Sequence, residues 1–232
     1  MADGGATRLI HGIPRTFAVI AALALILVAF SPTPGRPFTA HALRVLLVTF
    51  VAAPLLLLGL PPGPLRALGA RRRSAWMVAV VTAPPTAFFC FTAGLGLALL
   101  PPCVAFARRD PLAGAMMQVA WTLTALVAWW CACAPQGAPG RSRDPVAMAH
   151  LFLLGVPLQI AAGAVTVADR SLYAGIGLAD QRTGGLVLWV PGGLLLWVAI
   201  TALWVRWARR TAREAAGDDE APPLHVPGGA SS

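Results

Sequence analysis

The sequence predicts an all-α protein, a polytopic transmembrane bundle of about six helices. Of its 232 residues, 57% are hydrophobic and only 12% are charged, whereas soluble domains contain about 25% charged residues. The mean hydropathy is +0.71. Apolar runs of about 20 residues, the length that crosses a bilayer, recur between short polar or Pro/Gly-rich segments. The lipid bilayer is therefore the first expected partner.

The breaks between the apolar runs set the expected spans. Ser31-Pro32-Thr33-Pro34, which follows the first run, is not a small-residue cleavage site, so this run is expected to remain as a span rather than leave as a signal peptide. Pro-Gly linkers and arginine runs cannot continue an apolar helix. The third span contains Pro84-Pro85, which predicts a kink. The spans are placed at about 13–30, 40–60, 74–100, 112–134, 146–168 and 185–207.

The chain is expected to divide into an N-terminal segment at 1–12, a membrane domain at 13–210 and a tail at 211–232. The tail holds Asp218-Asp219-Glu220 and Pro222-Pro223 and lacks apolar content, so it is expected to be disordered.

Arginine counts predict the orientation. With both termini in the cytoplasm, the cytoplasmic segments hold twelve arginines and the opposite side holds five, Arg44 being left out because it lies within a span. The positive-inside rule then places both termini in the cytoplasm of a bacterial plasma membrane.

Composition and motifs also argue against other classes of function. The net charge is +9, but the arginines occupy short loops without interleaved aromatics, so nucleic acid is not an expected partner. No nucleophile elbow, HExxH motif or phosphate-binding loop occurs in the sequence, and we therefore expect no enzymatic activity.

Soft metal donors are expected to meet at the outer membrane face. Cuprous copper prefers thiolate and thioether ligands with some imidazole. Methionine is also a common filler of apolar gaps, and an isolated cysteine is commonly a small hydrophobic residue. Both interpretations, a copper site and ordinary packing, stay open for the four residues that the predicted topology places there: His41, Cys103, Met116 and Met117.

Other polar residues have alternative roles. Arg44 is three residues after His41, on the same helix face, and either lines a site or extends to the headgroups. Gln118 and Gln159 are expected to form interhelical hydrogen bonds. Cys131 and Cys133 lie at the cytoplasmic end of the fourth span.

The last apolar run begins unusually. Asp180-Gln181 precedes Gly184-Gly185, and Trp189-x-Pro191-Gly192-Gly193 follows within the run. Proline and glycine within a span leave backbone groups that neighbouring protein must satisfy. We expect Asp180, Gln181, Gly184, Gly185 and Trp189 to form an ordered turn packed against the outer ends of other spans.

The chain resembles the CtaG family, membrane proteins linked to cytochrome c oxidase assembly and copper delivery. The resemblance covers roughly residues 30–210. It rests on Phe50–Pro61, which contains Ala53-Pro54-Leu55 and Gly59-x-Pro61, on Arg109-Asp110-Pro111-Leu112 with Trp129-Trp130, and on the Asp180–Gly193 motif. The resemblance implies assistance in maturing a haem-copper oxidase, with an oxidase subunit as partner and copper as cargo.

The chain departs from the CtaG pattern at the histidines that the resemblance implies as copper ligands. It keeps His41 and has other residues at five of the histidine positions: Val45, Leu99, Gly114, Gln118 and Gln159. Copper is then held by the softer outer set, or the chain keeps the fold without the metal. A copper or small-solute transporter and a structural membrane subunit are the alternatives.

The predicted orientation can be tested by cysteine labelling. A cysteine placed at Ser171 should react with an impermeant reagent added outside, because the loop 169–184 is predicted to face outward, whereas a cysteine at Ser142 should be protected. Labelling at position 142 with protection at position 171 would contradict the orientation.

Overall fold

The computed structural model describes residues 15–29, 37–61, 63, 72–135 and 137–218, and the elements within them are helices without strands. The predicted all-α class is therefore confirmed. In chain order the elements are α2 (Arg15–Ala29), α3 (Pro37–Leu47), the π-helix η1 (Val48–Ala52), α4 (Ala53–Gly59), α6 (Arg72–Val81), α7 (Pro84–Leu99), α8 (Pro101–Arg109), α9 (Pro111–Cys133), α10 (Asp144–Val167) and α11 (Leu178–Asp218).

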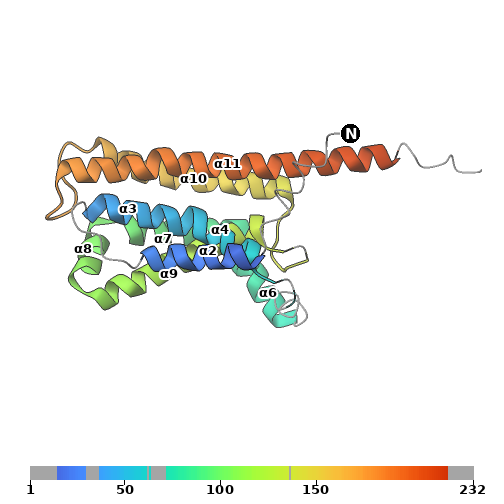
Figure 1. The fold of residues 1–232 in the computed structure, drawn as a ribbon, viewed down its shortest axis with the longest axis horizontal. Coiled ribbons are helices and arrows are strands. Elements are labelled where there is room, and N and C mark those ends of the chain that lie inside the picture. The colour runs from blue at the N-terminus through green and yellow to red at the C-terminus, as the bar shows by residue number, and fades with distance from the viewer. Residues whose placement is uncertain (1–14, 30–36, 62, 64–71, 136, 219–232) are drawn as a thin grey trace, which may run out of the picture.

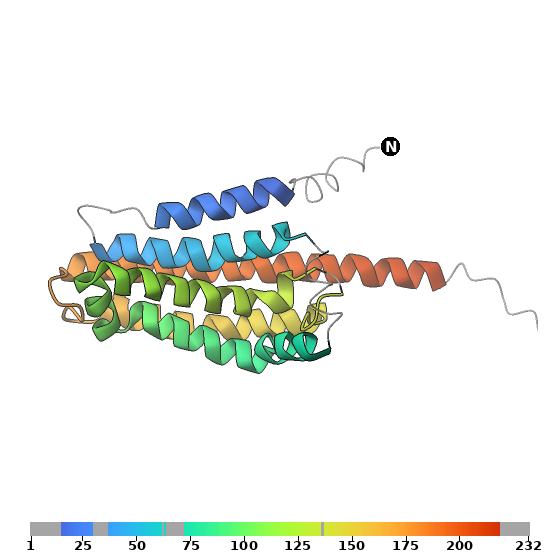
Figure 2. The same ribbon diagram turned by 90° about the horizontal axis from the view of Figure 1, so that it is seen from below.

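The long helices lie side by side along one axis (Figures 1 and 2). The most extensive contacts join α10 to α11, α11 to α3, and α7 to α9, while α2 packs on α4 and η1. One end of the bundle carries α8 and the loop 168–177 and is called the α8 end. The opposite end carries α6 and the loop 134–143 and is called the α6 end. The start of α2 and the end of α11 both point toward the α6 end.

The described helices make this chain a membrane protein, although six spans are more than they provide. Four helical segments are long and apolar enough to cross a membrane: Pro37–Gly59, Pro111–Cys133, Asp144–Val167 and Leu178–Ala216. The bent pair α6–α7 makes a fifth if it counts as one span. Of the first predicted span, the structure describes α2, whose 15 residues measure about 22 Å against the roughly 30 Å of hydrocarbon.

The predicted kink at Pro84-Pro85 is confirmed. Helix α6 ends at Val81, α7 begins with the two prolines, and the two helix axes differ by 57°. A proline has no N–H to donate to the preceding turn but fits the first positions of a helix. The prolines therefore end one helix and begin the next.

Helix α11 differs from the prediction at both ends. It is continuous from Leu178 to Asp218, so the segment from Asp180 to Gly185 is helical and the expected turn is wrong. At the other end α11 continues through Ala208–Ala216, beyond the expected start of the tail, because alanine, arginine and glutamate are good helix formers. Residues 219–232 of the expected tail, and all of the expected segment 1–12, lie outside the described residues.

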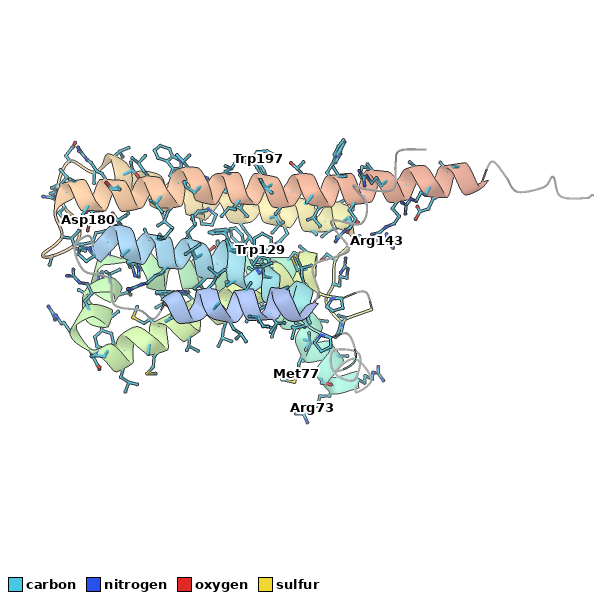
Figure 3. All side chains as sticks on the ribbon, in the orientation of Figure 1. Arg73, Met77, Trp129, Arg143, Asp180 and Trp197 are labelled. Carbon is cyan, nitrogen blue, oxygen red and sulfur yellow. The ribbon has the colours of Figure 1, made fainter. Side chains whose placement is uncertain are left out.

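The π-helix η1 has a cause in the sequence. The N–H of Ala53 donates to the carbonyl of Val48, five residues earlier. The next such bond would join Pro54 to the carbonyl of Thr49, but proline has no N–H. The indole Nε1–H of Trp129, from α9, donates to the Thr49 carbonyl instead, at 2.7 Å. Trp129 lies in the centre of the bundle (Figure 3) and is 3% exposed, so this replacement bond is buried.

This explanation predicts that the effects of changing Trp129 and Pro54 are coupled. Trp129→Phe should lower the free energy of unfolding by about 1–3 kcal/mol, because it leaves the Thr49 carbonyl buried without a donor. In a Pro54→Ala background the new N–H can reach the preceding turn, and the same change should cost less. A double-mutant cycle measured by unfolding in detergent checks the coupling. Equal costs in both backgrounds would contradict it.

Candidate functional site

A polar contact between distant parts of the chain joins α11 to the first turn of α3. The carboxylate of Asp180 accepts hydrogen bonds from the N–H of Phe38 (2.8 Å), the N–H of Thr39 (3.1 Å) and the Thr39 hydroxyl (2.6 Å). The first N–H groups of a helix have no partner within it and favour a negative charge. Asp180 therefore caps α3 from another helix, at the α8 end of the bundle (Figure 3).

The neighbouring amide, Gln181, ties the loop 168–177 to two helices. Its side chain is fully buried. The Nε2 group donates to the carbonyl of Val165 on α10 at 3.0 Å, and Oε1 accepts from the N–H of Leu172 at 2.6 Å. An amide has both donors and an acceptor, so Gln181 can satisfy two backbone groups of opposite kind.

The two glycine pairs of α11 let this helix approach two others. A Cβ on Gly184 would meet the ring of Phe38 at 2.5 Å, and one on Gly192 would meet Leu158 at 3.2 Å and Leu46 at 3.7 Å. On Gly193 it would overlap the Gln159 amide. On Gly185 it would meet the backbone nitrogen of Thr166 at 3.0 Å. The pairs thus give α11 close packing on both α3 and α10.

His41 and Tyr173 bond the end of α7. In a helix, the carbonyl of Ala98 would accept a hydrogen bond from the N–H three or four residues later. Those positions are Pro101 and Pro102, which have no N–H, so the Ala98 carbonyl lacks a backbone donor. The His41 ring nitrogen Nε2 lies 2.7 Å from that carbonyl, and the Tyr173 hydroxyl donates to the next carbonyl, Leu99, at 2.6 Å. Burial raises the pKa of the Tyr173 phenol, which keeps it a protonated donor.

The bond to Ala98 also defines the His41 ring. A carbonyl oxygen can only accept, so Nε2 must carry the proton, and Nδ1 then carries the lone pair. Histidines that bind metals commonly donate their other N–H to a carbonyl in this way. The ring also packs edge-on against Trp121 of α9, with centroids 5.4 Å apart. His41 is thus both a helix cap and a pre-oriented imidazole.

The other predicted copper donors occupy different environments. Cys103 lies in the first turn of α8, between the spans predicted at 74–100 and 112–134, and its side chain is half-buried. Met116 is 65% exposed. It is five positions before Trp121, about 140° around the helix from the face that meets His41, whereas Met117 is one turn before Trp121 and half-buried. Among the described residues, no three His, Cys, Asp or Glu side chains come close enough to hold a metal ion.

The positions where the CtaG pattern implies further histidines have packing or bonding roles. Val45 borders a cavity of about 10 Å³ beside Thr49, Trp121 and Thr124, a volume near that of one water. Gln159 bonds the Trp189 carbonyl on α11 at 3.4 Å, as expected of an interhelical amide. Gln118 is buried, and its Nε2 has no partner within the described part of the chain.

The cysteine pair lies at the α6 end, away from His41. Cys131 is fully buried and its thiol lies 3.8 Å from the carbonyl of Ala128. His150 of α10 is also buried, within 3.1 Å of the same carbonyl. The His150 ring therefore bonds the adjacent helix α9 in the core.

The tight contact at Gly185 predicts a large effect of a side chain there. Gly185→Leu should lower folded yield and the free energy of unfolding by more than the roughly 1–3 kcal/mol usual for overpacking, because a Cβ there would overlap the Thr166 hydroxyl and meet the Thr166 backbone nitrogen at 3.0 Å. Gly177→Leu is the matched control, since a Cβ there meets nothing within 4 Å. Thermal unfolding in detergent compares the two variants. Equal melting temperatures would show that α11 does not need this close approach.

The family model described as cytochrome c oxidase caa3 assembly factor (Caa3_CtaG) matches residues 7–210, which is most of the chain. Neither the comparison with curated proteins nor that with solved structures found a match. The family match includes every contact described above: the Asp180 cap, the glycine pairs, the Pro54–Trp129 pair and His41. The chain therefore belongs to the family of cytochrome c oxidase caa3 assembly factors.

Proposed function

We propose that this protein assists the maturation of a haem-copper oxidase in the bacterial plasma membrane, without catalysing a reaction itself, and that both termini are cytoplasmic. The family match over residues 7–210 carries this proposal. The apolar helices are consistent with action inside the bilayer, where an oxidase subunit would be the partner. The arginine split between the two sides supports the orientation.

Copper is the cargo that we propose for this factor, with His41 at the centre of the site. The geometry of the ring supports this proposal: Nε2–H is bound to the Ala98 carbonyl, so Nδ1 is held in position to act as a ligand. The soft donors that we propose beside it are Met117, one turn before the His41 neighbour Trp121, and Cys103 at the start of α8. Among the four predicted ligands, Met116 is the least suited to bind copper at this site, because its side chain is exposed.

Transport of copper or a small solute would require a polar path through the bundle. The small cavity beside η1 is bordered by Val45, Thr49, Phe91, Gly94, Leu95, Ala98, Trp121 and Thr124, and not by Arg44, Gln118 or Gln159. No contact within the described residues favours transport over assembly.

The copper proposal predicts which variants lose the metal. Under reducing conditions, purified protein should bind cuprous copper. The double variant Cys103→Ser, Met117→Leu should lose it, while Cys131→Ser, Cys133→Ser should keep it. Copper stoichiometry with a cuprous chelator measures this directly. If only the Cys131→Ser, Cys133→Ser variant lost copper, the proposed site around His41 would be contradicted. If neither the wild type nor any variant bound copper, the proposal that copper is the cargo would be contradicted.

The assembly role is tested separately, in a deletion strain. Membranes of this strain should show reduced haem-copper oxidase absorbance, and expression of the wild-type chain should restore it. The variant with Cys131→Ser and Cys133→Ser should also restore it, which serves as the control. Unchanged oxidase absorbance in the deletion strain would refute the assembly role whatever the copper result.

A further inference from the structure

A buried carboxylate joins two helices at the α6 end. Asp144, at the start of α10, has a side chain that is 4% exposed. Arg206 Nη2 donates to its Oδ1 at 2.6 Å, and Arg210 Nη2 lies 3.1 Å from Oδ2 without hydrogen-bond alignment. The two arginines are one turn apart on α11. A single carboxylate therefore balances two guanidinium groups.

A third guanidinium adds to the excess of positive charge around Asp144. Arg141, in the loop between α9 and α10, donates to the Ala134 carbonyl. Its pKa is lowered chiefly by burial and then by the positive charge of Arg206, with Asp144 acting in the opposite direction. Three positive groups and one negative group leave an excess of two positive charges. We call Asp144, Arg141, Arg206 and Arg210 the Asp144 cluster.

The cluster also has hydrogen-bonding capacity left over. The Nε of Arg206 is buried and has no partner among the described residues. A guanidinium presents donors in a planar fork that matches the oxygens of a phosphate. An added anion with several oxygens would offset the excess charge and accept from the N–H groups of Arg210 and Arg141.

The surroundings of the cluster indicate a membrane surface. Trp204 and Trp207 lie on the same turns of α11 and are 54% and 38% exposed. Exposed tryptophan is typical of the headgroup level of a bilayer. After these tryptophans, α11 extends past the other helices at the α6 end (Figure 1). Arg143, labelled in Figure 3, lies at this end too. A phosphate at this level belongs most simply to a lipid.

We propose that the Asp144 cluster binds the phosphate of an anionic lipid headgroup at the α6 end of the bundle. Arg210 and Arg141 are the groups with room to meet it, because Arg206 is held by Asp144. The bound headgroup would fix α11 against α10 and the loop 134–143. This inference is independent of copper and of the oxidase.

The test compares lipid-dependent stability in nanodiscs. Wild-type protein should melt at a higher temperature in phosphatidylcholine containing phosphatidylglycerol than in phosphatidylcholine alone. Native mass spectrometry should show a retained phosphatidylglycerol molecule. Arg210→Gln and Arg141→Gln should each bind this lipid about tenfold more weakly, as expected for one lost charge-assisted hydrogen bond. Arg206 and Asp144 are left unchanged, because theirs is the closer, hydrogen-bonded ion pair of the buried carboxylate, and breaking it would destabilise the fold itself.

Arg213→Gln is the matched control. Arg213 lies on α11 one turn after Arg210 and is exposed, so it contributes equally to general surface charge but lies outside the cluster. It should keep the full lipid effect. An equal loss in Arg213→Gln would overturn the proposal in favour of unspecific attraction. A stabilisation produced by inorganic phosphate in detergent, with none from the lipid, would overturn the lipid as the source.

Discussion

The structure depends on backbone carbonyls that prolines leave without a donor inside the bilayer. Pro54 removes the N–H that the Thr49 carbonyl would meet in η1, and Trp129 supplies a replacement. Pro101 and Pro102 do the same to Ala98, and His41 supplies the replacement there. With no water in the hydrocarbon region, each such group would cost several kcal/mol if unpaired. The helices are thus held in register by specific bonds and not only by apolar packing, which discriminates poorly between positions when lipid is equally apolar.

These bonds connect motifs that are far apart in the sequence. The second-helix motif with Pro54 meets the central motif with Trp129, and the last-helix motif with Asp180 meets the start of α3 at Phe38 and Thr39. Trp129 supplies the donor that the Pro54 segment lacks, and Asp180 supplies the acceptor that the first turn of α3 lacks. This explains why a chain with only nine acidic residues uses one of them, Asp180, to cap a helix more than 140 residues away.

Features of the fold that depend on residues adjacent in the sequence could be predicted from the sequence. The apolar runs and the Pro84-Pro85 break predicted the long helices and the 57° bend, because both follow from neighbouring residues. The extension of α11 to Leu178, the helix α8 and the π-helix were missed. For two of these the stabilising partner lies elsewhere in the chain: Thr39 bonds Asp180 at the start of α11, and Trp129 bonds the carbonyl that Pro54 leaves without a donor in η1. The proline at position 54 was the available signal, since it necessarily leaves one earlier carbonyl unpaired. For the site, sequence placed His41 among the donors but could not show that its Nε2 is already committed to Ala98.

The commitment of His41 constrains any role that it has in handling copper. If Nε2–H must stay on the Ala98 carbonyl to hold the end of α7, only Nδ1 can bind a metal, and binding there leaves the fold intact. A ligand that keeps its structural bond does not need the bundle to open when copper arrives or leaves. The side chains that would move instead are those of Met117 and Cys103, both half-buried. Cys103 belongs to the short helix α8. If copper is the cargo, as we propose, the fixed imidazole would stay in place while the ion exchanges among the thioether and thiol ligands.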